Sequence, residues 1–355
     1  MPQESVKILS AETVNLRGAE RRSASSTWSG SPQAGAVAKT HSGDLIVLTT
    51  LAEPPQIVLL RSRDQGRTWS KPIRVRDRAA LRPKSSTANR VDDVATLSVL
   101  RSGRILGVIY SDIGWPRKTL LWSLYSDDDG TTWHKSPEQH GSRPFASTIP
   151  GFPILEENNG TLVLPAMGLV DLDPALPFGG IAAVGVLRSR DQGLTWGDVS
   201  IIAKGDEAMS TAPNECSVLH LHQGRWLAMY RMNWVHPTSY PSIMTFRSVT
   251  SDRGRTWSPP QQVLGQVAWP WLHRLPDGGI MLLGSGASGT RYLVSYDEAS
   301  TWDYEGELDP CGDAITSTVT LDDRTIFTVH GAGLGSPQQT AYWYQGLRGR
   351  WIRKV

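Results

Sequence analysis

The residues Ser189-Arg190-Asp191-Gln192-Gly193-Leu194-Thr195-Trp196 form a pattern, S-x-D-x-G-x-T-W, that recurs along the chain. An Asp carboxylate can accept hydrogen bonds from backbone amides ahead of it, and Gly adopts backbone angles that other residues resist. The Trp can bury a large apolar area at the foot of the next strand. We call this pattern the octet; it predicts a tight turn between two strands. Its five copies, the fourth opening with Thr and the fifth with Ala in place of Gly, lie at 62–69, 126–133, 189–196, 250–257 and 295–302.

A second pattern alternates with the octets. It consists of an apolar run, a short turn and another apolar run, which is the signature of a β-hairpin. Five of the turns contain Gly, and the sixth reads Asp322-Asp323-Arg324. The six turns are centred at positions 43, 103, 160, 224, 278 and 324.

Together the two patterns give four antiparallel strands per unit and six units. This arrangement predicts an all-β fold, a six-bladed β-propeller, that occupies residues 1–355 as a single domain. The sixth unit lacks an octet, and we expect its third strand at 340–344. Its fourth strand is either 351–355 or the N-terminal run 6–14; the latter would close the ring of blades.

Composition excludes several classes of protein. The formal net charge is only +2 over 355 residues, which argues against a nucleic-acid partner. The sequence contains no run of about 18 apolar residues, so it predicts no membrane-spanning helix. The first residues lack the apolar core of a signal peptide, so we expect a cytoplasmic protein, or a secreted one whose signal peptide has been removed. Cys216 and Cys311 are expected to be small buried residues. His236, His273 and His330 lack metal-ligand spacing, and we expect no metal and no cofactor.

Polar and aromatic residues precede the first strands of several blades, where a propeller has the mouth of its central channel. Carboxylates there are Asp93, Glu215 and Asp313, and the second strands end near the same level. Carboxylates, guanidinium groups and aromatic rings at one mouth suit a sugar ligand, although a carboxylate there can also simply satisfy backbone groups. The expected cationic and aromatic residues of this mouth are Arg90, Tyr110, Arg231 and Trp271.

Glu215 and Arg231 are expected to meet. Glu215 lies nine residues before Gly224 and Arg231 lies seven residues after it, so antiparallel pairing returns Arg231 to the level of Glu215. Either the pair is a structural salt bridge, or Arg231 holds an anionic ligand group while Glu215 moves a proton.

Five octets in a six-bladed pattern resemble the Asp-boxes of the sialidase (neuraminidase) superfamily, and this resemblance covers nearly the whole chain. The stretch from Asn214-Glu215-Cys216 to Arg231 resembles the sialidase segment that holds a catalytic Glu and an arginine of the carboxylate-binding triad. The resemblance implies that Glu215 is the general-base partner and that Arg231 binds the substrate. It also implies that Arg291 is the next triad arginine and that Asp313 lies where the nucleophilic Tyr is found in that family.

The sequence also departs from this family. Gln33-Ala34-Gly35-Ala36 stands where sialidases have an Arg-Ile-Pro motif, so one triad arginine is absent. No Tyr occurs near Cys311, and only Glu53 lies near the place of the family's acid. Arg247, before the fourth octet, is either a further cation of the site or a solvated strand residue.

These residues favour a sialidase-like exo-glycosidase that acts on a terminal acidic sugar. The departures favour a uronic acid, or another acidic or neutral sugar, over sialic acid, because a sialic acid needs the missing arginine and tyrosine. One alternative is a lyase, or another reaction on a non-sialic substrate in the same pocket. Another is a glycan-binding propeller without catalysis. The expected partner is a glycan or small molecule, and the sequence leaves the oligomeric state open.

Overall fold

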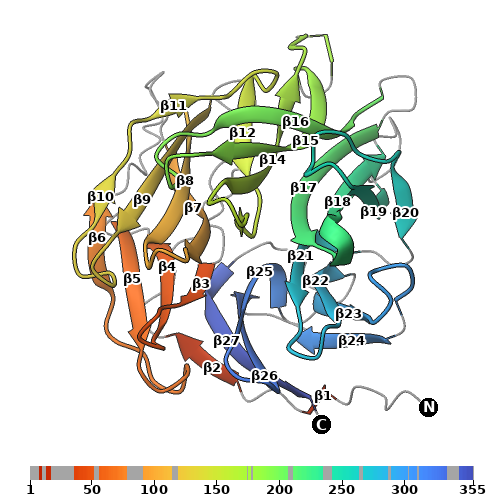
Figure 1. The fold of residues 1–355 in the computed structure, drawn as a ribbon. Coiled ribbons are helices and arrows are strands. Elements are labelled where there is room, and N and C mark those ends of the chain that lie inside the picture. Colours follow the sequence, from red (N-terminus) through yellow and green to blue (C-terminus); the bar gives the residue numbers. More distant parts are fainter. Residues whose placement is uncertain are drawn as a thin grey trace.

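The computed structural model describes residues 8–9, 13–16, 36–51, 56–77, 91–113, 119–173, 175–176, 179–206, 211–234, 242–263, 267–286, 289–302, 304–309, 312–333 and 344–354. In these residues the chain forms strands and a single 3-10 turn, His222–Gly224. The strands make six separate antiparallel sheets arranged as a ring (Figure 1). The prediction of an all-β, six-bladed propeller is confirmed.

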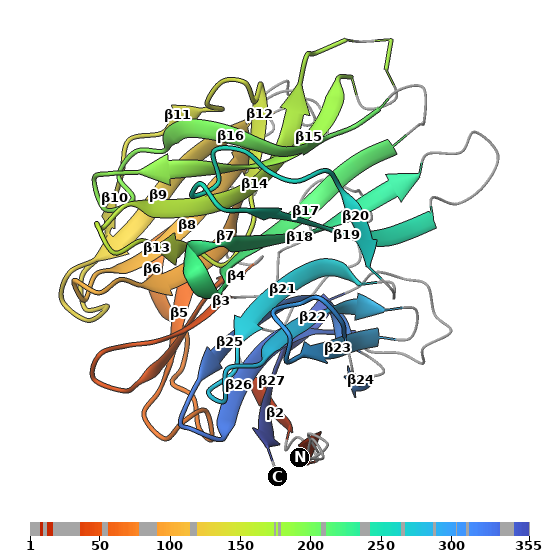
Figure 2. The ribbon, with the colours of Figure 1, turned by 45° about the vertical axis from the view of Figure 1, so that its right-hand side comes forward.

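The first five blades follow the chain. Blade 1 contains β3 (Ala36–Lys39), β4 (Leu45–Leu51), β5 (Gln56–Ser62) and β6 (Ile73–Asp77). Blade 2 contains β7 (Val91–Val99), β8 (Ile105–Asp112), β9 (Thr119–Ser126), β10 (His134–Lys135) and β11 (Gln139–His140). Blade 3 contains β12 (Ser147–Pro150), β13 (Leu155–Glu156), β14 (Leu162–Val170), β15 (Ile181–Ser189) and β16 (Gly197–Lys204). Blade 4 contains β17 (Thr211–His220), β18 (Trp226–Trp234), β19 (Ser242–Thr250) and β20 (Gln261–Val263). Blade 5, beside blade 4 in Figure 2, contains β21 (Ala268–Arg274), β22 (Ile280–Gly286), β23 (Gly289–Ser295) and β24 (Tyr304–Asp309).

Blade 6 joins the two ends of the chain. Its strands are β25 (Gly312–Thr320), β26 (Thr325–Gly333) and β27 (Tyr344–Lys354), and β27 is also paired with β1 (Ile8–Leu9) and β2 (Thr13–Leu16). The N-terminal strands therefore close the ring, as one of the two predicted alternatives stated. Of the third strand expected at 340–344, only Tyr344 lies within the described residues, and it is the first residue of β27. β27 also includes most of the run 351–355, which was the other candidate for the fourth strand.

Two inner strands contain bulges near their first residues. Glu215 and Trp269 lie inside β17 and β21, at bulges where two residues face one on the partner strand. Blade 3 differs from its prediction because its inner strand is split into β12 and β13. Pro153, in the break, has no N–H to donate to a ladder. A Cβ on the neighbouring Gly151 would lie 2.2 Å from the carbonyl oxygen of Cys216, so only Gly fits there.

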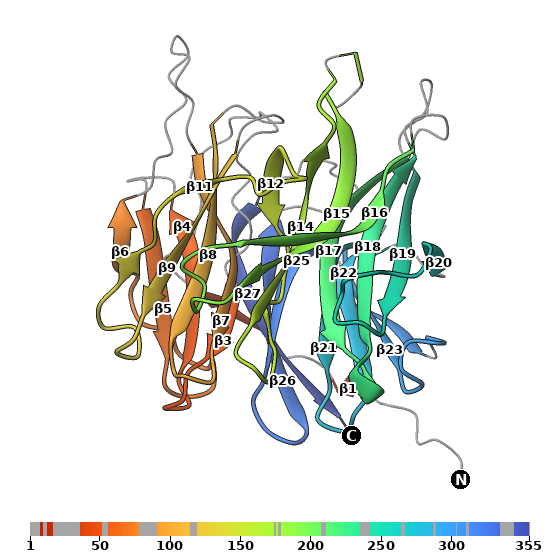
Figure 3. The ribbon, with the colours of Figure 1, turned by 45° about the horizontal axis from the view of Figure 1, so that its top comes forward.

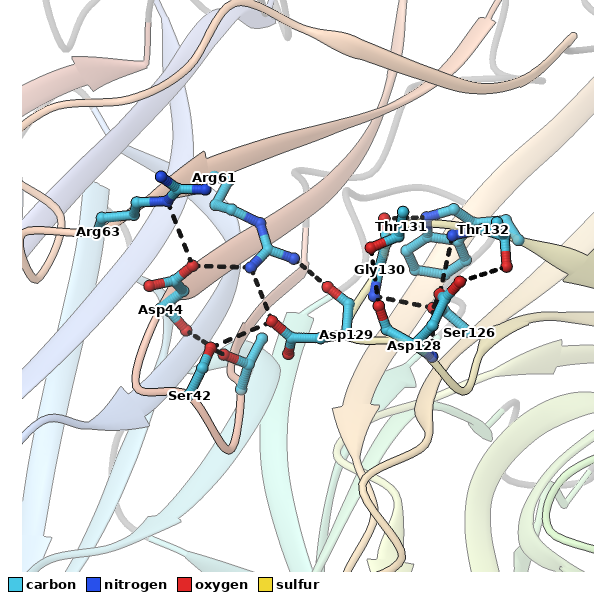
Figure 4. A network of polar contacts seen from close by, with 12 residues as sticks. Ser42, Asp44, Arg61, Arg63, Ser126, Asp128, Asp129, Gly130, Thr131 and Thr132 are labelled. Carbon is cyan, nitrogen blue, oxygen red and sulfur yellow. Dashed lines mark hydrogen bonds and ion pairs between the residues drawn. The ribbon is translucent and has the colours of Figure 1, made fainter.

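The octets form the expected turns. In the third octet the Asp191 carboxylate accepts hydrogen bonds from the Ser189 hydroxyl (2.7 Å), the Thr195 amide (2.9 Å) and the Thr195 hydroxyl (2.6 Å). The Ser189 hydroxyl in turn accepts the Gly193 amide at 2.8 Å. Gly193 has a φ of 85°, which is why Gly is favoured there. Figure 4 shows the same bonds in the second octet, around Asp128.

Each octet turn is also bonded to the preceding blade. Arg188 of blade 3 donates to the carbonyl oxygens of Arg253 (2.9 Å) and Gly254 (3.0 Å) in the fourth octet. Arg61 of blade 1 donates to the carbonyl oxygen of Asp129 in the second octet (Figure 4). Trp351 of blade 6 donates to the carbonyl oxygen of Gln65 in the first octet. The octets therefore connect neighbouring blades as well as neighbouring strands.

Apolar clusters fill the seams between blades and the channel. Phe152 (2% exposed) of blade 3 and Trp271 (4% exposed) of blade 5 stack with their ring centroids 4.9 Å apart, so aromatic carbon joins two blades that are not neighbours in the ring. Cys216 is buried as expected, and burial raises the pKa of its thiol, whereas Cys311 lies outside the described residues. Within the described residues, no helix has the length and apolar character needed to cross a bilayer.

Candidate functional site

The mouth of the channel lies where the inner strands start and the second strands end. The hairpin tips lie at the other end of the blades, as the β25–β26 turn at the bottom of Figure 3 illustrates. The octets follow the third strands, which run from the mouth to that far end, so the octets lie away from the mouth. The candidate site therefore lies among the residues near the mouth.

Glu215 and Arg231 meet as predicted. Asn214 is the register partner of Arg231, and Glu215 is the extra residue of the bulge, with a φ of 42°. The Glu215 Oε1 atom lies 2.8 Å from an Arg231 Nη atom, and Glu215 Oε2 accepts the Trp269 amide at 2.9 Å. The side chains of Glu215 and Arg231 are 2% and 17% exposed. The ion pair thus has a buried anion and a cation that still reaches solvent.

Arg231 and Arg291 face the same seam. On β18, Arg231 shares a sheet face with Met229, which packs in the apolar cluster between blades 4 and 5. On β23, Arg291 shares a face with Leu293, which belongs to that cluster as well. The Arg291 side chain lies across Gly286, where a Cβ would come within 1.7 Å of the Arg291 Cδ atom. Tertiary structure therefore brings two of the predicted arginines to one seam near the mouth.

Asp93 and Tyr110 lie two blades away. They are register partners on β7 and β8, Asp93 is 1% exposed, and Tyr110 packs against the cluster of blades 3 and 4. The neighbouring Asp92 points to the opposite face, where it accepts the Ser111 hydroxyl at 2.6 Å. Asp93 is thus a buried carboxylate near the mouth but in a different seam from Glu215.

The other predicted site residues are placed differently. Arg247 lies near the octet end of β19, where it bonds the Gln261 side chain (2.9 Å) and the Ala299 carbonyl, so it is not at the mouth. Trp271 is covered by its stack on Phe152. Asp313 is described only as backbone of β25, and Glu53, Arg90 and His236 lie outside the described residues.

Two features were missed by reasoning from sequence. Trp269, which was not among the predicted site residues, donates its amide to Glu215 and is partly exposed, whereas the predicted Trp271 is buried. The second feature is a buried charge cluster between blades 5 and 6. Asp309 (1% exposed) lies 3.1 Å from Arg348, 3.0 Å from Arg350 and 3.5 Å from His330. No sequence spacing connects these residues, which come from three strands.

In the described part of the chain, no group of three His, Cys, Asp or Glu side chains is arranged to hold a metal ion.

The fold resembles several solved structures at low identity. A protein of unknown function from Dyadobacter fermentans matches with a TM-score of 0.71 and 17% identity over 100% of both chains. The GH93 α-L-arabinofuranosidase of Fusarium graminearum, solved with arabinobiose, matches with a TM-score of 0.69 and 15% identity over 98% of both chains. The Hadza microbial sialidase Hz136 matches with a TM-score of 0.64 and 18% identity, over 90% of this chain and 65% of that one. At such identities these matches establish the fold alone.

No curated protein matches the sequence. The model of the BNR repeat-like domain family matches residues 53–283, which is more than half of the chain. This match agrees with the repeated octets and the six blades. The protein therefore belongs to the BNR repeat-like domain family.

Proposed function

We propose that the protein is a glycoside hydrolase of the sialidase-like type that acts on a terminal acidic sugar at the mouth, in the seam between blades 4 and 5. The observation that carries the proposal is the Glu215–Arg231 pair, in which the arginine side chain is 17% exposed while the carboxylate side chain is 2% exposed. Arg291 faces the same seam and supplies a second positive charge. Two arginines that face one seam suit a ligand that carries a carboxylate.

In this proposal Arg231 and Arg291 bind the acidic group of the sugar, and Glu215 is the proton-transferring carboxylate. Glycoside cleavage needs a second carboxyl group across the bond, and Asp93, Asp313 and Glu53 are the candidates. Support also comes from solved structures of the same fold, since two of those described above are named as a sialidase and an arabinofuranosidase. The absent arginine and tyrosine favour a uronic acid over a sialic acid.

A second candidate, a glycan-binding propeller without catalysis, is favoured by one observation. Both carboxylate oxygens of Glu215 are already bonded, one to Arg231 and the other to the Trp269 amide. A carboxylate held in this way is stabilised as an anion and is a poorer base. The same residues would then bind an acidic sugar without cleaving it.

The test is a panel of 4-nitrophenyl uronides, sialosides and arabinofuranosides, assayed for cleavage, with the matching methyl glycosides titrated for binding. We expect cleavage of an acidic glycoside and little release of sialic acid. Arg231→Lys keeps the charge but loses the planar guanidinium group, which can donate two parallel hydrogen bonds to a carboxylate. It should therefore weaken the binding of acidic ligands by about tenfold and change the binding of neutral ligands little. Arg247→Lys, the same change at the far end of blade 4, is the control.

Binding of an acidic glycoside without cleavage would establish the second candidate. If no glycoside is cleaved or bound, both candidates fail. Rapid hydrolysis of a simple sialoside would contradict the proposed preference for other acidic sugars.

A further inference from the structure

Trp269 is held in a strained backbone conformation by its neighbour. Its φ of 54° lies in the left-handed region, which bulky residues rarely adopt, and it is part of the bulge between Ala268 and Trp271. Its amide donates to Glu215 Oε2, on the adjacent inner strand, at 2.9 Å. Such strain persists only where surrounding contacts impose it, and it gathers at functional sites. The bulge of blade 5 is therefore coupled to the bulge of blade 4.

The Trp269 side chain lies where two apolar clusters meet. It packs against the cluster formed by Trp271 and its neighbours, and also against the cluster of blades 3 and 4, which includes Met167 and Cys216. Blade 5 borders blade 4 through a different cluster, that of Leu272 and Leu282. Cys216 follows Glu215 on β17, the inner strand beside β21, so the indole meets the second cluster where the inner strands of blades 4 and 5 adjoin.

Trp271 is buried, in contrast to Trp269. It is two residues further from the mouth on the same strand and stacks on Phe152. Trp269, in contrast, is only partly buried. Its exposed portion therefore faces the mouth, next to the carboxylate of Glu215 and the guanidinium group of Arg231.

We propose that Trp269 is the aromatic platform of the site: the apolar C–H face of a sugar ring stacks on its indole while the anionic group of that sugar reaches Arg231. This inference rests on the proposed function and specifies its ligand as a sugar with an apolar face beside a carboxylate. The hydrogen bond from the Trp269 amide to Glu215 fixes the height and tilt of the platform. Glu215 thus positions the ring in addition to any role in proton transfer.

The first test needs no ligand. The protein is labelled with 5-fluorotryptophan, Trp269→Phe identifies the Trp269 fluorine signal, and Trp271→Phe identifies that of Trp271. A soluble gadolinium chelate should relax the Trp269 signal several-fold more strongly than the Trp271 signal, because only the former ring is accessible. Equal protection of the two signals would overturn the platform, whatever the protein binds.

The second test separates the platform from the proposed function. Methyl β-glucuronide and methyl β-glucoside, which share a ring and differ in the carboxylate, are titrated into the protein. Trp269→Leu should weaken the binding of both glycosides about tenfold, because apolar contact with the sugar ring is lost. Arg231→Lys should weaken the binding of the glucuronide only. Trp133→Leu, the same change in a partly buried octet tryptophan, is the control. Unchanged affinities in Trp269→Leu would overturn the platform alone, and a parent protein that binds neither sugar would overturn both proposals.

Discussion

At the scale of single residues, backbone strain marks the mouth. Most described non-glycine residues with positive φ lie in octets or at hairpin tips, where a turn requires it, such as Gln192 and Gln223. Glu215 and Trp269 are the two on inner strands, and a hydrogen bond joins them. Strained residues cost about 1–3 kcal/mol each and are retained where function or packing over-determines them. Their pairing is a second feature, beside the Glu215–Arg231 ion pair, that points to the seam between blades 4 and 5.

The role of Glu215 can be tested by Glu215→Gln. The change keeps the shape but removes the base, so under the proposed function kcat should fall at least about a hundredfold. Because the carboxylate is 2% exposed and paired, the free energy of unfolding should also fall, by about 1–3 kcal/mol. Glu298→Gln, which breaks an ion pair with Arg274 at 2.7 Å far from the mouth, is the matched control. Steady-state kinetics with unchanged kcat in Glu215→Gln would assign Glu215 a structural role.

At the scale of elements, the octet is a turn that also binds the next blade. Its side chains satisfy the amides of the turn, which leaves its carbonyl groups to accept from the preceding blade. Partial burial acts to raise the pKa of Asp191, but hydrogen bonds from Thr195 and Ser189 hold the pKa below its ordinary value. The carboxylate is therefore an anion throughout the physiological range, and its contribution to stability is lost only as the pH falls through the acid range.

Asp191→Ala should destabilise the protein without changing its chemistry. The amide and hydroxyl of Thr195 and the hydroxyl of Ser189 would lose their acceptor, which should lower the free energy of unfolding by about 1–3 kcal/mol. Denaturant unfolding measures the loss, and ligand binding at the mouth should be unaltered. Asp323→Ala, at an exposed hairpin turn, should cost far less. An Asp191→Ala protein of unchanged stability that no longer binds or cleaves glycosides would refute the structural assignment of the octet.

At the scale of the whole molecule, the ring is closed by pairing strands from the two ends of the chain. The seam between blades 5 and 6 carries Asp309 and the two arginines around it. His330 lies in this cluster, fully buried, and its Nδ1 atom donates to the carbonyl oxygen of Gly331 at 2.9 Å. Burial lowers the pKa of His330 to about 4, despite the nearby Asp309 carboxylate. Its ring is therefore neutral in the folded protein at neutral pH.

The folded pKa of His330 lies below its unfolded value of about 6.5. Its contribution to stability is fully present above pH 6.5 and is lost as the pH falls from 6.5 to about 4, because the unfolded chain takes up the proton first. We expect the loss to reach about 2–3 kcal/mol near pH 4.5. Denaturant unfolding at pH 7 and pH 4.5 should show a smaller pH effect in His330→Gln than in the parent.

His222→Gln provides the comparison for this pH effect, since the His222 side chain is 75% exposed. It should leave the difference in stability between the two pH values as it is in the parent. The same pH dependence in His330→Gln and the parent would show that other groups cause it.

The sequence by itself determined the blades. Ser, Asp, Gly and Thr at fixed spacing dictate the octet through local hydrogen bonds, and the apolar runs around each turn dictate the hairpins, so the number of blades follows from counting. It also brought Glu215 and Arg231 together, because both flank one hairpin. Contacts between blades were decided only by the tertiary structure. Arg231 and Arg291 share a seam, Trp269 bonds Glu215 of the neighbouring blade, and Asp309 meets His330, because residues far apart in sequence pack there. The bulges that re-aim Glu215 and Trp269 arise where inner strands crowd around one axis, and no periodicity within a single strand encodes that crowding.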